Sequence, residues 1–351
     1  MPTSYAGSFT MTGVAIATAL RGSGPDDGYN SPAFNRFLEN IPVVASRIES
    51  QYIGSSYPDK GFLQGNVHAG MPFDPEVGTV SRTGSDVLIP AFMAAYTSGN
   101  PHKQFLNPFP SFSAVRPNWR ITYDGLLNLG RLRDIFKSFT LSHAYQCTYS
   151  VGSYSSYLNW VGIDGSDNLG FTLDELSGQP IPSSPFNISS VAITERFAPL
   201  VGAAVTLKNN MTVNAEWREQ RTLTLNSSAG QVVEATSRGI TMGLGYKIVG
   251  FNTVLKMRKT QTGISNDLNI TGDFSYAVNQ ALIRRIETAY TQATSGTRTI
   301  NINVAAKYQM SRRFNLGAYL EHQINTPIVS STAYPTSSTA FGFSFNLSLA
   351  R

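Results

Sequence analysis

The sequence predicts an all-β protein, a segment of an antiparallel transmembrane outer-membrane β-barrel, and three observations lead to this fold class. Only 14% of the 351 residues are charged, whereas soluble globular proteins carry roughly 25%. Hydrophobic residues make up 41% of the chain, yet no apolar run approaches the ~20 residues that a membrane helix needs. Apolar and polar side chains instead alternate in many separate stretches, which is typical of strands that face lipid on one side and water on the other.

The clearest alternation runs from Met211 to Asn226, where odd positions begin with apolar side chains and even positions are polar. Period two over such a length indicates a strand. Similar patterns, some weaker, cover 7–20, 117–125, 138–154, 188–208, 231–248, 251–262, 266–279, 281–290, 300–310, 314–320 and 341–349. We therefore expect about twelve strands.

The stretch 188–208 keeps its phase long enough to project beyond a bilayer, which needs only ~9–11 residues per strand. We interpret it as one tall strand. Pro199 lies within it and cannot donate a hydrogen bond to the ladder. The strand is therefore expected to bend or bulge at Pro199, or to lie at a sheet edge.

The links between strands differ between the two ends of the predicted sheet. One end has the tight links Asn209-Asn210, Val249-Gly250, Asn279-Gln280 and Ser311–Arg313, and the other has 227–230, 291–297 and 325–338. Outer-membrane barrels have short periplasmic turns and longer extracellular loops. The tight end is therefore predicted to be periplasmic, with both chain termini on that side and a lipid-facing band between Trp217 near one interface and Tyr308 and Phe314 near the other.

Residues 1–351 are expected to form one β-barrel unit with two long excursions. The excursion 21–116 is predicted to be extracellular or lumenal, with a helix capped by Ser31 and stopped early at Pro42 and a buried segment from Asp86 to Tyr96. The excursion 155–187 is rich in Ser, Gly, Asp and Pro and is predicted to be an irregular extracellular loop. The opening residues lack a basic leader, so we expect further sequence upstream.

No catalytic, cofactor or metal site is predicted. The four histidines are widely separated, and none has the paired spacing of a zinc site. Ser142 and His143 are adjacent, so strand alternation points their side chains to opposite faces of the sheet. They therefore cannot hydrogen-bond to each other as nucleophile and base. Cys147 is the only cysteine. The net charge of +5 comes without a basic cluster with interleaved aromatics, so nucleic-acid binding is not expected.

Several phrases of the sequence resemble the C-terminal region of the SprA/Sov family, the outer-membrane translocons of type IX secretion and gliding motility in Bacteroidetes. They occur in the same order along nearly the whole chain. The phrases lie at 86–96, 117–126, 136–145, 148–154, 189–200, 207–210, 314–316 and 325–327. The family-motif positions that follow from them are Pro117, Asn118, Trp119, Arg120, His143, Tyr145, Pro199, Asn325 and Pro327.

The resemblance implies a bacterial cell outer-membrane protein that forms part of the wall of a very large single-chain barrel. Such a barrel conducts folded cargo proteins with C-terminal secretion domains, and gate and plug partner proteins cover it; outer-membrane lipid surrounds it. The family implies a conduit and no enzyme. About twelve strands cannot supply a lumen for a folded protein, because barrel diameter grows with strand number. The chain is therefore expected to be an arc of the wall.

Two alternatives remain open at this stage. One is a self-contained twelve-strand porin or solute transporter in which 21–116 plugs the lumen. The other is a soluble or surface-attached β-sandwich that only binds, with Phe341, Phe343 and Phe345 in its core. Extraction behaviour in detergent separates a barrel from a sandwich.

Overall fold

The structure is a computed structural model of the chain. It describes residues 5–12, 18, 20, 28–97, 99–110, 117–128, 130–165, 168–174, 176–257, 260–310, 314–329 and 333–347, with 252–266 described by their backbone. The chain is mostly antiparallel β-sheet, which confirms the all-β class.

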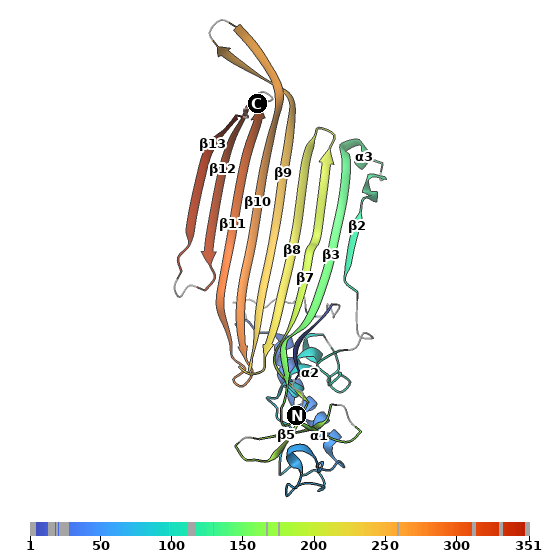
Figure 1. Ribbon diagram of the computed structural model, residues 1–351. Helices are drawn as coiled ribbons and strands as arrows, with labels where there is room; N and C mark the ends of the chain where they lie inside the picture. The colour runs from blue at the N-terminus through green and yellow to red at the C-terminus, as the bar shows by residue number, and fades with distance from the viewer. Residues whose placement is uncertain are drawn as a thin grey trace, which may run out of the picture.

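Among the described residues the main sheet contains ten strands, and Figure 1 shows them side by side in one long, curved layer. Their order across the sheet is β1-β3-β7-β8-β9-β10-β11-β12-β13, with β2 on the same edge of β3 as β1. Every pairing is antiparallel. The strands are β1 (Ala6–Thr12), β2 (Trp119–Tyr123), β3 (Phe136–Ser156), β7 (Phe186–Leu207), β8 (Met211–Asn226), β9 (Gln231–Met257), β10 (Thr260–Arg285), β11 (Thr291–Gln309), β12 (Phe314–Pro327) and β13 (Thr336–Leu347).

The expected number of about twelve strands was wrong because two predicted turns lie inside strands. Gly250 has a positive φ of 71° but is an irregular position within β9, and the β9–β10 register shifts only between Asn266 and Leu268. The Asn279-Gln280 pair lies inside β10, where both neighbouring strands pair with it. Long-range pairing therefore decides against a turn at these positions. Four predicted strands merge into two, so the directions of the later strands are unchanged.

The two ends of the sheet are called here the short-turn end and the loop end. The short-turn end has the Asn209-Asn210 turn, in which Asn210 adopts φ 64°. The loop end has the link 227–230, as predicted, and the link between β10 and β11. The predicted loop 291–297 is wrong, since these residues form the start of β11. Strand structure also shortens the predicted loop 325–338, and the predicted link Ser311–Arg313 lies outside the described residues.

The prediction that both termini lie at the short-turn end was wrong for the N-terminus. β1 pairs antiparallel with β3, and Ala6 lies opposite Ser155 at the loop end. β13 ends at the short-turn end, where Leu347 lies opposite Phe314. Figure 1 accordingly marks the two ends of the chain at opposite ends of the sheet.

The sheet is an open layer within the described residues. β13 forms one edge, β1 and β2 together form the other, and no described pairing joins the two edges. The ladder register is regular from β8 to β13 apart from shifts in β10. As predicted, β7 is one tall strand, and its register with β8 shifts between Phe197 and Val201, on either side of Pro199.

A helical unit, residues 28–110, packs at the loop end of the sheet (Figure 1). It contains α1 (Pro32–Tyr52), η2 (Gly61–Leu63) and α2 (Ser85–Tyr96). Ser31 caps α1 as predicted, since its Oγ accepts a hydrogen bond from the Phe34 N–H at 3.3 Å. The residues of α2 from Val87 to Tyr96 are all buried, also as predicted.

The prediction that Pro42 stops the first helix was wrong. A proline in a helix interior costs about 3 kcal/mol. The turns beyond Pro42 bury Val44, Ile48 and Tyr52, and burial of one large apolar side chain contributes about 1.5–3 kcal/mol. The burial outweighs the lost hydrogen bond, so the helix continues.

The excursion 155–187 is more regular than predicted. It contains a small antiparallel sheet of β4 (Val161–Gly162), β5 (Gly170–Leu173) and β6 (Pro180–Ser183). Phe171 of β5 is fully buried against Tyr52, with ring centroids 5.4 Å apart. A short stretch before β3 contains η4 (Gly125–Asn128) and α3 (Leu132–Ile135). Within the described residues, no helix is both long and apolar enough to cross a membrane.

Candidate functional site

Most of the family-motif residues come together around the irregular part of β7. The Trp119 ring lies 4.7 Å from that of Tyr145, and Tyr145 lies 4.8 Å from Phe197, measured between ring centroids. His143 lies beside Trp119, and its Nδ1 donates to the Leu200 carbonyl oxygen at 2.6 Å. Pro199 removes one ladder donor at this point. This aromatic cluster packs against the strand where the β7–β8 register shifts.

Asn118 lies where β3 changes its edge partner. β2 pairs with β3 up to Tyr145, and β1 pairs with it from Thr148 onward. The Cys147 N–H falls between the two partners and donates to Asn118 Oδ1 at 2.9 Å. The side chain of Asn118 thus continues the hydrogen bonding of the strand across the junction. Pro117 precedes Asn118 and is exposed.

Asn325 and Pro327 lie apart from the aromatic cluster, at the loop end of β12. Asn325 Oδ1 accepts hydrogen bonds from Thr299 Oγ1 at 2.9 Å and from Gln323 Nε2 at 3.3 Å. Pro327 is the last residue of β12 and pairs with Thr297. The structure therefore divides the nine motif positions into two groups. One lies on and beside β2, β3 and β7 near one edge of the sheet, and the other lies on β12 near the opposite edge.

Trp119→Ala is expected to impair folding of the chain. The substitution removes the ring that covers Tyr145 and His143, and for this half-buried side chain we expect a loss of about 2 kcal/mol in the free energy of unfolding. Chemical denaturation of the variant and the natural protein measures this loss. Trp119→Phe is the matched control and should retain most of the contact. A free energy of unfolding within about 0.5 kcal/mol of the natural protein's would contradict the prediction.

One face of the sheet carries an exposed band of large apolar side chains, which we call the apolar band. The ladder places these side chains on one face, because directly opposed residues in an antiparallel pair point the same way. Two to four members come from each of β9, β11 and β13. The band comprises Val201, Trp217, Ile240, Met242, Leu244, Tyr246, Phe274, Ile302, Val304, Leu320, Phe341, Phe343, Phe345 and Leu347. Exposed apolar patches of this extent mark interaction or membrane surfaces.

The opposite face, which we call the polar face, carries hydroxyl, amide and charged side chains at the same levels. The two faces alternate residue by residue along each strand, as the sequence pattern predicts. Arg218 and Glu216 form an ion pair here. The polar face at these levels includes Asn214, Glu216, Arg218, Asp273, Ser275, Asn301, Asn303, Glu321 and Gln323.

Buried ion pairs continue the apolar side of the sheet toward the loop end, where the helical unit covers it. Arg221 Nη2 lies 2.5 Å from Glu195 Oε2, and both side chains are at most 5% exposed. Arg221 also donates to Thr18 Oγ1, which donates to the Tyr96 carbonyl oxygen of α2 at 3.0 Å. These contacts join two strands of the sheet to the helical unit.

A second buried pair lies further along the same face. Arg284 is fully buried, and its Nη2 donates to Glu234 Oε2 at 2.9 Å. Its Nη1 donates to the Tyr29 carbonyl oxygen at 2.6 Å, and its guanidinium carbon lies 5.8 Å from the Phe34 ring centroid. Sequence reasoning missed this pair. The available signal was the presence of charged residues in the phase that elsewhere carries apolar side chains.

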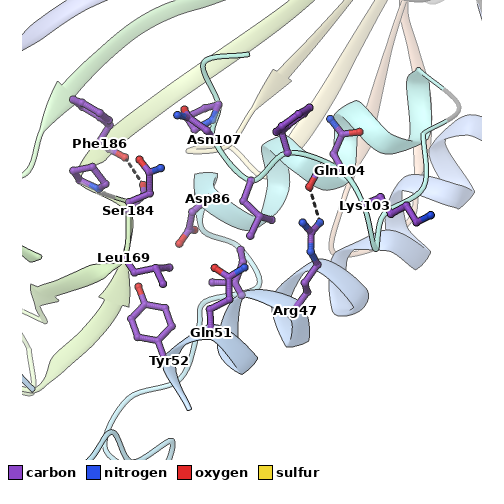
Figure 2. A pocket seen from close by; sticks show the side chains of 16 residues that line it. Arg47, Gln51, Tyr52, Asp86, Lys103, Gln104, Asn107, Leu169, Ser184 and Phe186 are labelled. Atoms are coloured by element: carbon purple, nitrogen blue, oxygen red, sulfur yellow. Dashed lines mark hydrogen bonds between the residues drawn. The ribbon is translucent and has the colours of Figure 1, made fainter. Parts of the chain in front are cut away.

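The helical unit and the small sheet enclose a pocket of about 440 Å³ (Figure 2). Arg47 and Lys103 lie on one side of it, and Leu169 and Ser184 lie on the other. Arg47 Nη1 holds the adjoining loop by donating to the carbonyl oxygens of Pro101 at 2.9 Å and of Gln104 at 2.6 Å.

Asp86, in the first turn of α2, faces this pocket (Figure 2). Burial raises the pKa of the Asp86 carboxyl from 3.8 to about 6, because low-polarity surroundings disfavour the charged form. Backbone hydrogen bonds from Asp86, Val87 and Ser184 lower the pKa in part; the Val87 N–H donates to Oδ1 at 3.1 Å. The carboxyl is therefore largely neutral below pH about 6.

Asp86→Asn is expected to remove a pH dependence of stability. Since the pKa in the folded state lies above the unfolded value, the folded protein binds more protons between these two values. The stabilising contribution is complete below pH about 4 and is lost as the pH rises through about 6. The Asp86 carboxyl is partly exposed to the pocket, which reduces the effect. We expect the free energy of unfolding of Asp86→Asn at pH 7 to exceed that of the natural protein by about 2 kcal/mol.

Chemical denaturation of both proteins between pH 4 and pH 8 checks this expectation. The difference in the free energy of unfolding between the variant and the natural protein should be near zero at pH 4 and should grow as the pH rises. Ser85→Ala, next to Asp86 in α2, is the control for a change in the same turn. A difference that stays constant over the whole range would show that Asp86 does not titrate as described.

Metal-binding clusters of three or more His, Cys, Asp or Glu side chains do not occur among the described residues. Cys147 is buried and forms no disulfide. No family model and no curated protein matches the chain.

Proposed function

We propose that this chain forms an arc of the wall of an outer-membrane β-barrel, with the apolar band against lipid and the polar face toward the lumen. The observation that carries the proposal is the separation of the two kinds of side chain onto opposite faces of one sheet. Val304 and Asn303, neighbours on β11, lie on the apolar band and the polar face respectively. A soluble sheet with one face this apolar normally covers it with a second layer.

The height of the apolar band fits this proposal. In the register, Trp217 shares a row with Ile300, and Tyr308 lies at the other end of the band. From 300 to 308, at ~3.4 Å per residue, the strand covers about 27 Å before tilt. Outer-membrane barrels have an apolar band ~25 Å tall with aromatic residues at both borders. Trp217, at 45% exposure, suits one of those borders.

Four buried charged residues on the apolar side support the same boundary. Glu195, Arg221, Glu234 and Arg284 all lie beyond Trp217 toward the loop end, beneath the helical unit. These residues are buried against protein and paired with opposite charges, which offsets much of the free-energy cost of removing a charge from water. An unpaired charge in hydrocarbon would have a high cost. In this arrangement the helical unit lies outside the bilayer at the extracellular end.

The proposed wall needs further strands to close. The edges at β13 and at β1 and β2 each leave one side of a strand without a ladder partner among the described residues. In hydrocarbon each unsatisfied backbone group costs several kcal/mol, so spanning sheets are closed. We propose that strands outside this chain complete the barrel.

We further propose that the complete barrel is a type IX secretion translocon of the SprA/Sov kind. This part of the proposal rests on the ordered series of sequence phrases that resemble that family. Its cargo would be folded proteins with C-terminal secretion domains, and its partners would be the gate and plug proteins and outer-membrane lipid. The protein would act as a conduit for export linked to gliding motility, without catalysis on the cargo.

Site-specific photo-cross-linking at neighbouring positions tests the proposal. A photoreactive amino acid at Asn303 should cross-link exported cargo in living cells, whereas the same group at Val304 should not. The two positions are matched in strand and depth and differ in face. Absence of cargo adducts at Asn303 and at the other polar-face positions would overturn the translocon assignment. A protein that stays soluble without detergent would overturn the membrane assignment as well.

A further inference from the structure

A second cavity, of about 450 Å³, opens on the polar face where β2, β3 and β7 lie side by side. Arg120 of β2 lies opposite Ala144 of β3, and Arg196 of β7 lies opposite Gln146 of β3. A depression lies between the two arginines because the side chains of Ala144 and Ala198 there are small. The cavity is therefore a shallow basin with a guanidinium on either side.

These two arginines are exposed and lack carboxylate partners among the described residues. Two other arginines of this sheet behave differently, since Arg218 pairs with Glu216 on the polar face, and Arg238 pairs with Glu219. The basin thus has two positive charges that no described acidic side chain balances.

Two amide side chains complete the polar lining. Asn118 uses Oδ1 to accept the Cys147 N–H, so its Nδ2 is the group left to donate into the basin. Gln146 is exposed and adds a second amide. Trp119 and Tyr145 also border the basin, but the register points their rings to the opposite face of the sheet. Guanidinium and amide donors of this kind recognise oxyanions.

We propose that this basin binds carboxylate groups of an acidic polypeptide segment on the polar face. Strand spacing and the two-residue offset put the Cα atoms of Arg120 and Arg196 roughly 12 Å apart. That separation suits two carboxylates of an extended segment better than one small anion. Each arginine presents a planar fork that matches a carboxylate with two parallel hydrogen bonds. The inference rests on the proposed function, since it takes the polar face as the side along which cargo passes.

The shape of the polar face beside the basin also favours an extended chain. A further depression of about 230 Å³ shares Arg196 and Ala198 with the basin and continues across the sheet. Its floor includes Gly239 and Ala277, which leave room above the strands. A segment bound at the arginines therefore has a trough into which its neighbouring residues fit.

Binding of a labelled hexaglutamate peptide to the whole protein in detergent tests the proposal by fluorescence anisotropy. We expect saturable binding that weakens with added salt. Arg120→Gln and Arg196→Gln should each weaken it about tenfold or more, since each removes the guanidinium fork that pairs with one carboxylate. Lys307→Gln is the matched control, because it removes one positive charge from the same face at a distance.

Unchanged affinity in both arginine variants, or equal loss in Lys307→Gln, would overturn the site. Displacement of the peptide by inorganic phosphate at equal concentration would overturn the peptide assignment, and equal binding of hexalysine would do the same. Failure here is distinguishable from failure of the proposed function. Cargo cross-linking at Asn303 that persists in Arg196→Gln, together with absent peptide binding in the natural protein, would remove the basin and leave the conduit in place.

Discussion

Replacing Arg284 with leucine is expected to lower the free energy of unfolding by about 3–5 kcal/mol, the cost of leaving one member of a buried ion pair without its partner. Glu234, at 3% exposure, would keep a carboxylate with no guanidinium beside it. The variant also loses the hydrogen bond from Nη1 to the Tyr29 carbonyl oxygen. The substitution therefore removes the ion pair and should also weaken the attachment of the helical unit to the sheet.

The double variant Arg284→Leu with Glu234→Leu separates charge burial from packing. Replacement of both members of a buried pair by apolar side chains is often close to neutral. The double variant should therefore be more stable than Arg284→Leu alone, as measured by chemical denaturation of the protein in detergent. Arg218→Leu serves as the surface control, since Arg218 and Glu216 form an exposed pair, and such pairs contribute about 0–1 kcal/mol.

Limited proteolysis of the helical unit gives the second measurement. In Arg284→Leu, cleavage between 28 and 110 should become faster than in the natural protein, while cleavage in the double variant should return toward the natural rate. A single variant that unfolds within 1 kcal/mol of the natural protein, with unchanged cleavage, would contradict the role assigned to this pair.

Val304→Arg is expected to cost about 2–4 kcal/mol in the membrane, the depth-dependent penalty of a cation at the bilayer midplane of a barrel. Val304 lies in the middle row of the apolar band, opposite Leu320 on β12 and level with Leu244 on β9. Placing a guanidinium there exposes it to hydrocarbon if the band faces lipid. The amount of heat-modifiable, membrane-inserted protein measures the effect.

Asn303→Arg is the matched control, one residue away on the same strand. Its side chain would point to the polar face, where Glu321 lies directly opposite and can pair with it. We expect its effect to stay within about 0.5 kcal/mol, as for most surface substitutions. Equal behaviour of the two arginine variants would exclude lipid as the neighbour of the apolar band.

The alternation of side chains was sufficient to predict much of the sheet. Period two placed Met211 and Trp217 on one face and Asn214 and Glu216 on the other, and the register confirms that assignment. The bulge at Pro199 was also predictable, because a missing donor acts locally. The N-cap at Ser31 was predictable for the same reason, because it depends only on residues close to it in the sequence.

The candidate site was predictable only in part. The phrase around Trp119 and the positions His143 and Tyr145 are recognisable in the sequence, but their packing depends on the pairing of β2 with β3. The partnership of Arg196 with Arg120 around one basin has no sequence signal, because 76 positions separate them along the chain. Only the strand order brings the two guanidiniums to one cavity.

By itself the sequence determined the all-β class and the faces of the strands, since both follow from side-chain period within single segments. Only the tertiary structure decided that Gly250 and Asn279 lie inside strands, that α1 continues past Pro42, and that β1 starts at the loop end. The physical reason is that these outcomes depend on partners far away in the chain. Ladder hydrogen bonds and the burial of α1 and α2 against the sheet outweigh the local preferences for turns and helix ends.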